Sequence, residues 1–385
     1  MRITANQVTA ARLLLMPLLC GLVYGDEQWR LVGVVVGTLI GLTDLVDGWL
    51  ARKQGPTVLG GLMDPVADKV FITCCFIPFA DRGWAPWWFV AALLCRELLV
   101  TALRSCFEAR GKRIPSDYVA KVKTWVQMAG YGLLILAPIL SRTWTLALLG
   151  FISGGLAVAS VVWRIARGSM WRGGVVGAVS FAAPLLVCAF GSLDAYVWAV
   201  MAAILGITWV SAWPYFVAAV RELVLAPHAG RSQASCWNLD SSEASWRSQR
   251  GGGRGFDLVR VAGAIAVSLL GVAALGPATA ASWALIALLG TEFALHGLDN
   301  LLAHHGKADD ARVWGGRLAG EAALLGAALL WPAWAAAFAV AALALAVAGA
   351  AISFYTHRAL YWGGPVNPSP RPAPQGAPQT GPAHR

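Results

Sequence analysis

Four aspartates lie close together in residues 43–70, which read TDLVDGWLARKQGPTVLGGLMDPVADKV. Asp44 and Asp47 are three residues apart and Asp64 and Asp68 are four apart, so on helices each pair shares one face. Carboxylate oxygens are the ligands that Mg²⁺ prefers, and a two-metal site can clamp a phosphoryl group. The spacing therefore predicts a site for two Mg²⁺ ions, with Mn²⁺ as a substitute, that acts on a phosphate substrate.

Small residues accompany these aspartates. Gly48 and Ala51 fall on the stripe of the first pair, and Gly60 falls on the face of the second pair. A turn around Gly55-Pro56 lets the second helix run back antiparallel to the first. We expect the two helices to present four carboxylates to a common space near the cytoplasmic end of a membrane.

The alternative is that these aspartates are ordinary charges at helix ends, paired with Arg52 and Lys69. An acidic side chain at the centre of a membrane helix costs about 2.5–3.5 kcal/mol and usually marks a function. Two nearby cations cannot neutralise four clustered carboxylates, whereas divalent metal ions can. The metal site is therefore the better interpretation.

The elements that carry these residues are long apolar runs. Of the 385 residues, 58% are hydrophobic and 13% are charged, whereas a soluble domain has about 25% charged residues. Each run is long enough to cross a bilayer, where the backbone must satisfy its own hydrogen bonds as a helix. We expect an all-α integral membrane protein with helices over residues 8–25, 31–50, 60–80, 86–108, 119–140, 143–163, 173–191, 195–219, 257–277, 281–303, 316–332 and 334–355.

Membrane topology explains the net charge of +10 better than nucleic-acid binding does. With Met1 in the cytoplasm and twelve spans, the outward loops hold only Arg30, Arg82 and Arg142, while the inward loops hold many basic residues. This positive-inside pattern predicts a cell (inner) membrane protein with both termini and the active site facing the cytoplasm. The first 24 residues lack an A-x-A-like cleavage site, so we expect a retained first helix. The seven cysteines have no metal or disulfide spacing and are expected to be packing residues.

Three zones follow one another along the chain. Residues 1–170 contain six helices and almost all of the chemically suggestive polar residues. Residues 171–363 contain six more helices, interrupted over 226–255 by a stretch rich in Ser, Gly and Arg that is typical of a flexible cytoplasmic linker. Residues 364–385 are rich in proline, which predicts an extended, disordered tail.

One segment of the first zone resembles a known family. The run Asp44-x₂-Asp47-Gly48-x₂-Ala51-Arg52-x₇-Gly60-x₃-Asp64-x₃-Asp68 is similar to the defining motif of the CDP-alcohol phosphotransferases, with all eight fixed positions filled. The likeness extends over residues 1–170, where Asn6-x₂-Thr9-x₂-Arg12-x₄-Pro17 is similar to the family's first helix. The text GGLMDPVADKV, followed by CRELLVTALR, looks most like bacterial phosphatidylglycerophosphate synthases.

The resemblance implies a six-helix catalytic bundle and a role for each motif residue. It implies that the two metal ions are held by Asp44, Asp47, Asp64 and Asp68, of which Asp68 also acts as the general base. It implies that room for the cytidine is left by Gly48, Ala51 and Gly60, and that the CDP phosphates are contacted by Arg52. The chemistry agrees, because a flat base needs a face without side chains and a diphosphate leaving group needs cations.

An acceptor alcohol that carries a phosphate needs a basic pocket. The candidates on the fourth and fifth helices are Arg96, Arg104, Lys121 and Lys123. Arg96 is the most informative of them, because it lies within an apolar run beside Glu97. Arginine binds phosphate with two hydrogen bonds and lysine as a point charge. The alternative is that these cations are ordinary positive-inside anchors.

The second half carries a weaker signal. Glu292, His296 and Asp299 share one helical stripe, which is typical either of a metal site or of a satisfied polar cluster between helices. The second interpretation is favoured because a second set of ligands is not evident. A further hypothesis is a degenerate repeat, in which residues 257–330 would superpose on residues 9–75.

Together these patterns predict transfer of a phosphatidyl group from CDP-diacylglycerol to an alcohol, with glycerol 3-phosphate as the expected acceptor and phosphatidylglycerol phosphate and CMP as products. Membrane lipids are expected partners, nucleic acid is not, and a homodimer is left open. Cardiolipin, phosphatidylinositol-type and phosphatidylserine-type synthases are the alternatives with the same chemistry. A divalent cation transporter is disfavoured because transporters place their ligands near the bilayer midplane, often in repeated halves. The second half could also be a fused interaction or lipid-handling module.

Overall fold

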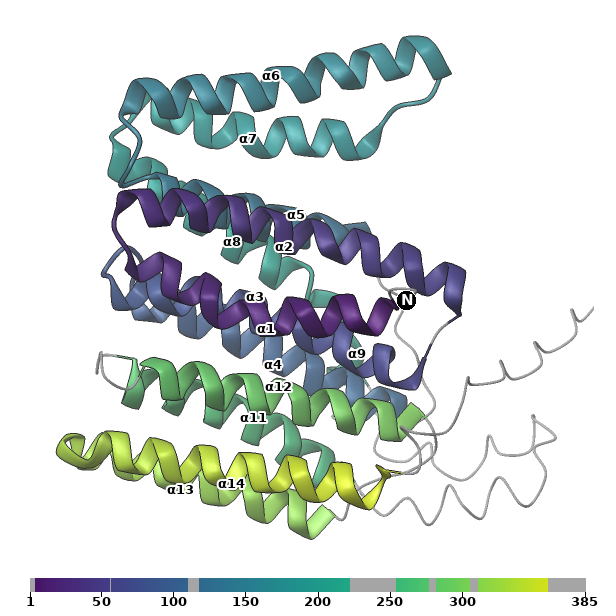
Figure 1. Cartoon of the computed structure of the whole chain (residues 1–385), viewed down its shortest axis with the longest axis vertical. Helices are drawn as coiled ribbons and strands as arrows, with labels where there is room; N and C mark the ends of the chain where they lie inside the picture. The colour runs from purple at the N-terminus through teal and green to yellow at the C-terminus, as the bar shows by residue number, and fades with distance from the viewer. Residues whose placement is uncertain are drawn as a thin grey trace, which may run out of the picture.

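The computed structural model describes residues 4–55, 57–109, 118–221, 254–276, 282–304 and 311–358. These residues form twelve helices of 18 residues or more, one short helix and a 3-10 turn, but no strand. The long helices lie side by side in one elongated stack (Figure 1). Their bounds are α1 Ala5–Tyr24, α2 Glu27–Gln54, α3 Val58–Asp81, α4 Trp87–Ala109, α5 Tyr118–Leu136, α6 Arg142–Arg167, α7 Arg172–Phe190, α8 Leu193–Val210, α11 Arg254–Leu275, α12 Ser282–His304, α13 Ala311–Leu330 and α14 Ala335–Thr356. The predicted all-α fold is confirmed.

Five segments are long and apolar enough to cross a membrane by their own composition. They are Ala5–Tyr24, Arg142–Arg167, Gly173–Phe190, Leu193–Ala219 and Pro332–Thr356. Large apolar side chains on their outer faces are exposed far more than a soluble protein allows, as at Phe151, Ile165 and Phe190. The chain is a multi-pass membrane protein.

The connection between α2 and α3 sets the register of the two aspartate pairs. Gly55 has φ of 90°, a left-handed conformation that glycine adopts without a steric penalty. Thr57 then caps α3, because its side-chain oxygen accepts a hydrogen bond from the Gly60 backbone N–H at 3.0 Å. The predicted turn between two antiparallel helices is therefore present.

The predicted span over residues 195–219 lies within Leu193–Ala219, a segment long and apolar enough to cross a membrane. Its helix is interrupted by a turn: α8 ends at Val210 and a short helix α9 follows over Trp213–Ala219. Pro214 lies in the first turn of α9, where its missing N–H is harmless. Inside a helix a proline removes one backbone hydrogen bond, so the first turn of a new helix is a favourable place for it. The predicted linker over 226–255, apart from the start of α11, and the predicted tail over 364–385 lie outside the described residues.

Both halves of the chain share one hydrophobic core. The α6–α7 hairpin lies at one end of the stack and the α13–α14 pair at the other (Figure 1). In the middle, α3 packs against α1 on one side and against α12 on the other, while α4 packs against α11 and α12. Residues 71–80 of α3 are all buried as a result. The second half therefore covers the helix that carries Asp64 and Asp68.

The packing agrees only in part with the repeat hypothesis. α11 packs against α13 as α1 packs against α3. However, α2 packs mainly against α1, whereas α12 packs mainly against α3, α4 and α14. The proposed superposition of residues 257–330 on residues 9–75 stays a hypothesis.

Asp81, at the end of α3, joins three helices across the two halves. Its Oδ1 accepts a hydrogen bond from Ser282 Oγ of α12 at 3.0 Å, and its Oδ2 accepts one from Tyr24 OH of α1 at 2.9 Å. The Tyr24 ring also lies 6.0 Å from the ring of Trp283. Ser282 is fully buried, so its hydroxyl depends on these protein partners.

We predict that Asp81→Ala destabilises the protein by about 1–3 kcal/mol, because a buried hydroxyl loses an acceptor. Thermal unfolding in detergent measures the loss. In a double-mutant cycle, Ser282→Ala should have a much smaller effect in the Asp81→Ala background than in the wild type. Additive effects of the two substitutions would contradict a direct link between the halves.

Candidate active site

The two aspartate pairs lie on helix segments that adjoin the same turn. Asp44 and Asp47 belong to α2, and Asp64 and Asp68 belong to α3. Residues 44–50 are helical as predicted, and α2 continues to Gln54. The side chains of Asp44, Asp47, Gly48, Ala51 and Arg52 lie outside the described residues, and their roles stay predictions.

Helix α1 supplies the partners of both α3 aspartates. Thr9 Oγ1 donates a hydrogen bond to Asp64 Oδ1 at 3.0 Å. Arg12 Nη1 lies 3.3 Å from Asp68 Oδ1 in an ion pair. Thr9 and Arg12 are 1% and 4% exposed, whereas the Asp68 side chain is 55% exposed. The buried side chains of Thr9 and Arg12 therefore orient the two aspartates. The exposed part of the Asp68 side chain remains accessible to a substrate.

The same stripe of α1 also contacts the start of α3. Asn6, Thr9 and Arg12 are spaced three residues apart and share a face. Asn6 Oδ1 accepts a hydrogen bond from Thr57 Oγ1 at 2.9 Å. A Cβ at Gly60 would lie 2.8 Å from Asn6 Oδ1 and 2.9 Å from Thr57 Oγ1, so this position requires glycine for the close approach. The sequence marked these α1 residues by their polar spacing in an apolar run, but only the structure gives their partners.

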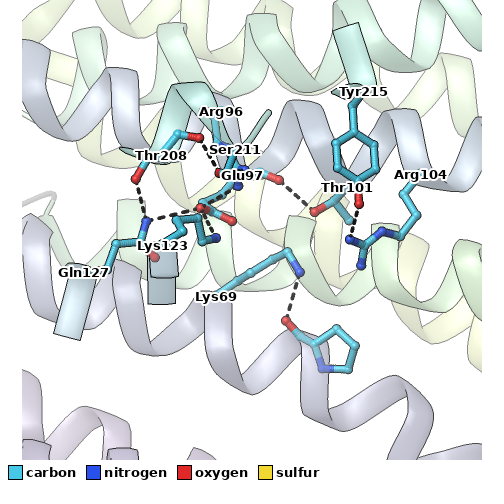
Figure 2. A network of polar contacts seen from close by, with 11 residues as sticks. Lys69, Arg96, Glu97, Thr101, Arg104, Lys123, Gln127, Thr208, Ser211 and Tyr215 are labelled. Carbon is cyan, nitrogen blue, oxygen red and sulfur yellow. Dashed lines mark hydrogen bonds and ion pairs between the residues drawn. The ribbon is translucent and has the colours of Figure 1, made fainter. Parts of the chain in front are cut away.

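A buried polar network joins α4, α5 and α8 (Figure 2). At its centre, Glu97 Oε1 accepts hydrogen bonds from Lys123 Nζ at 2.8 Å and from Arg96 Nη1 at 3.0 Å. Arg96 Nη2 donates to Ser211 Oγ at 2.6 Å. Gln127 Nε2 donates to Thr208 Oγ1 at 3.0 Å. The structure thus brings the predicted residues Arg96 and Lys123 together around one carboxylate.

Two more cations flank this network. Arg104 Nη2 donates to Tyr215 OH at 2.9 Å, and its guanidinium lies over the Tyr215 ring. Lys69 Nζ donates to the Pro65 carbonyl at 3.1 Å and is an electrostatic neighbour of Asp68, Glu97, Lys123 and Arg104 (Figure 2). Sequence reasoning had considered Lys69 only as a partner for the aspartates. The predicted Lys121 has its side chain outside the described residues.

The charges of this region are unequal and spatially ordered. Arg96 and Lys123 bind the carboxylate of Glu97, Lys69 is its electrostatic neighbour, and Arg104 in turn is an electrostatic neighbour of Lys69. Of the aspartates, Asp68 is an electrostatic neighbour of one of these cations, Lys69. An excess of buried positive charge attracts an anion, and a group of carboxylates attracts a metal ion. The arrangement can hold both, side by side.

Residues suited to a metal ion are present, although the described side chains do not complete a site. Among them, no group of three His, Cys, Asp or Glu residues lies close enough to hold one. The prediction requires four aspartates, and only Asp64 and Asp68 belong to that set. These two fit the requirement, since both are carboxylates held by α1.

The stripe on α12 forms a polar cluster, as the favoured interpretation held. Glu292 pairs with Arg317 of α13, and Asp299 pairs with Arg260 of α11. His296 Nε2 lies 3.9 Å from Glu292 Oε2. The acids therefore meet arginines from neighbouring helices.

Comparison with known proteins identifies the family. Residues 2–166 match the model of the CDP-alcohol phosphatidyltransferase family. The chain is 37% identical over 163 residues to a "Probable phosphatidylglycerophosphate synthase" of Mycobacterium tuberculosis, covering 41% of this chain and 71% of that protein. The chain belongs to this family. The family match ends at the end of α6, and α7–α14 lie beyond it.

Two other relatives carry a more explicit name, "CDP-diacylglycerol--glycerol-3-phosphate 3-phosphatidyltransferase". The protein of Bacillus subtilis is 30% identical over 145 residues, covering 34% of this chain and 75% of its own length. The protein of Rickettsia felis is 33% identical over 133 residues, covering 34% of this chain and 74% of its own length. This CDP-alcohol phosphatidyltransferase thus resembles shorter enzymes over its first half.

We predict that Thr9→Val lowers the transferase activity about tenfold. A hydrogen bond to a charged group contributes about 1.5–3 kcal/mol, and its loss lets the Asp64 carboxylate turn away. Steady-state rates in detergent measure the effect. Thr38→Val is the matched control, because Thr38 Oγ1 donates to the Val34 carbonyl of its own helix. Equal losses in the two variants would contradict a positioning role for Thr9.

Proposed function

We propose that this chain transfers a phosphatidyl group from CDP-diacylglycerol to glycerol 3-phosphate and releases CMP. The observation that carries the proposal is the adjacency of two charge clusters of opposite sign. Lys69 of α3 interacts electrostatically both with Asp68 of its own helix and with Glu97, Arg104 and Lys123 of α4 and α5. The first cluster suits a metal-bound diphosphate, and the second suits an acceptor that carries its own phosphate. The names of the relatives support the same pair of substrates.

Two Mg²⁺ ions, or Mn²⁺ in their place, would be held by Asp44, Asp47, Asp64 and Asp68. When bound, they would neutralise the charge that develops on the diphosphate as it is split. The observed chemistry of the donor set fits this role, because Thr9 and Arg12 orient Asp64 and Asp68 without covering Asp68. Gly48 and Ala51 would leave space for the cytidine, and Arg52 would contact its phosphates, whereas the space beside Gly60 is taken by Asn6 and Thr57.

In the transfer step, the acceptor hydroxyl oxygen attacks the phosphorus that carries the diacylglycerol. The bond from that phosphorus to the CMP oxygen breaks, and CMP leaves with the electron pair. Asp68 takes the proton of the hydroxyl as the new bond forms. Its 55% exposed side chain can reach the acceptor, while the ion pair with Arg12 fixes its orientation.

The acceptor phosphate would lie among Lys69, Arg96, Arg104 and Lys123, with Lys121 as a further contact. Glu97 would position this group, because it binds Arg96 and Lys123 at one oxygen and so holds α4 against α5. One carboxylate leaves most of the positive charge available to the phosphate.

The membrane side of the site follows from the loop charges. The basic loops of the positive-inside pattern lie at the end of the helices where α2 joins α3. The active site would therefore face the cytoplasm from the inner membrane. Soluble glycerol 3-phosphate and CMP could then enter and leave directly.

An acceptor panel with CDP-diacylglycerol and purified full-length protein tests the function. We expect radiolabelled glycerol 3-phosphate to be incorporated in the presence of Mg²⁺ and not after chelation. Asp68→Asn should lower CMP release about 10²–10⁴-fold, the usual contribution of a general base. Asp194→Asn, an exposed acid in the first turn of α8, is the control. Preferential use of inositol, serine or phosphatidylglycerol would overturn the proposed acceptor, and CMP release by Asp68→Asn at the wild-type rate would overturn the mechanism.

We further predict that Arg96→Gln raises the acceptor KM about tenfold or more and changes the KM for CDP-diacylglycerol much less. Loss of a charged hydrogen bond to phosphate has this magnitude. Initial rates at varied concentrations of each substrate separate the two constants. Arg142→Gln is the matched control, since Arg142 binds the Cys188 and Ala189 carbonyls on α7, outside this group. A larger change in the lipid KM would remove Arg96 from the acceptor pocket.

A further inference from the structure

The second half contains a cluster of ionisable side chains that the transfer reaction does not use. It is built by α11, α12 and α13, and all of its members are at least nine-tenths buried. They are Arg260, Glu292, His296, Asp299, Arg317 and Glu321, with Trp314 between them. Ionisable groups inside membrane helices are costly and usually mark a function.

Two carboxylates of this cluster converge on one nitrogen atom. Arg317 Nη1 donates both to Glu292 Oε1 and to Glu321 Oε1, the second at 2.5 Å. Both glutamates are fully buried, and the same guanidinium nitrogen binds one oxygen of each, which brings the two carboxyl groups close together. Two like charges this close in a low-dielectric interior repel strongly, so one of them is driven to take up a proton.

The neighbouring cations do not remove this repulsion. Arg260 of α11 forms an ion pair with Asp299 of α12. His296 is buried against the Trp314 ring, and its Nε2 lies 3.9 Å from Glu292 Oε2, which is too far for a hydrogen bond. Lys69 of α3 belongs to the group around Glu97. Among the described residues, the Arg317 guanidinium is thus the cation that binds both Glu292 and Glu321.

The site is built around Arg317 rather than around a metal ion. A Cβ at Gly349 of α14 would lie 2.5 Å from Arg317 Cδ, so the absence of a side chain at Gly349 makes room for the Arg317 side chain. The guanidinium lies 4.7 Å from the centre of the Trp314 ring. Glu321 Oε2 is buried and has no hydrogen-bond partner among the residues that the structure describes. An ionised carboxylate oxygen in that position would be expensive.

We propose that Glu292 and Glu321 share one bound proton beside Arg317, which makes this cluster a proton-binding site within the second half. The shared proton leaves a single negative charge, and Arg317 balances it. The site is independent of the proposed transferase reaction, since α12 and α13 contribute no group to that chemistry.

Infrared spectroscopy of the purified full-length protein at neutral pH tests the proposal. The difference spectrum between wild type and Glu321→Gln should contain the carbonyl stretch of a protonated carboxylic acid, which shifts in D₂O. Glu292→Gln should remove the same band, because either substitution leaves one carboxylate with one arginine. Glu27→Gln, at the exposed start of α2, is the control and should leave the band intact.

A second measurement uses thermal stability. The folded protein would bind one proton more than the unfolded chain, whose glutamates ionise above about pH 4–5, so stability should fall as the pH rises until the pair releases its proton. Glu321→Gln should remove that part of the fall. Should a glutamine variant fail to fold, Glu321→Asp keeps the acid and should shift the band. Absence of the band in the wild type, or its survival unshifted in any variant of Glu292 or Glu321, would overturn the proposal.

Discussion

A charge placed among apolar helices must meet an opposite charge, a hydrogen-bond partner or a bound ion, because the membrane interior offers no water to solvate it. This constraint governs all three polar regions of the protein. Arg12 meets Asp68 between α1 and α3, Glu97 gathers cations between α4 and α5, and Arg317 gathers glutamates between α12 and α13. Each region ties together helices that their apolar surfaces alone would leave free to rotate or slide.

The three regions differ in how completely they neutralise themselves, and the difference separates chemistry from packing. Around Lys69, cations outnumber the carboxylate of Glu97, and Asp68 remains partly exposed, which leaves charge available to substrates. In the second half, arginines meet the acids directly and little charge remains. The uncompensated charge therefore distinguishes the half that performs the transfer. The nearly compensated charge of the second half is typical of polar groups that pair with one another.

The second half nevertheless contributes to the site through α3. That helix is held by α1 on one side and by α12 on the other, and Asp81 links all three. Asp64 and Asp68 lie on this same helix, so the packing of α12 helps to hold the helix that carries them. A family member with this extension therefore differs from its shorter relatives in the support of its catalytic helix as well as in length.

The sequence by itself determined the helical membrane fold, the aspartate pairs and the polar stripes, because helical periodicity decides which residues share a face and bilayer thickness decides how long a helix must be. It could not determine which faces meet. Arg12 pairs with a residue 56 positions away, and Arg96 with one 115 positions away, so these contacts depend on how side chains from distant helices pack. The same holds for Arg317 between two glutamates and for α12 against α3. Local spacing predicted that polar groups needed partners, and only the tertiary structure decided which ones.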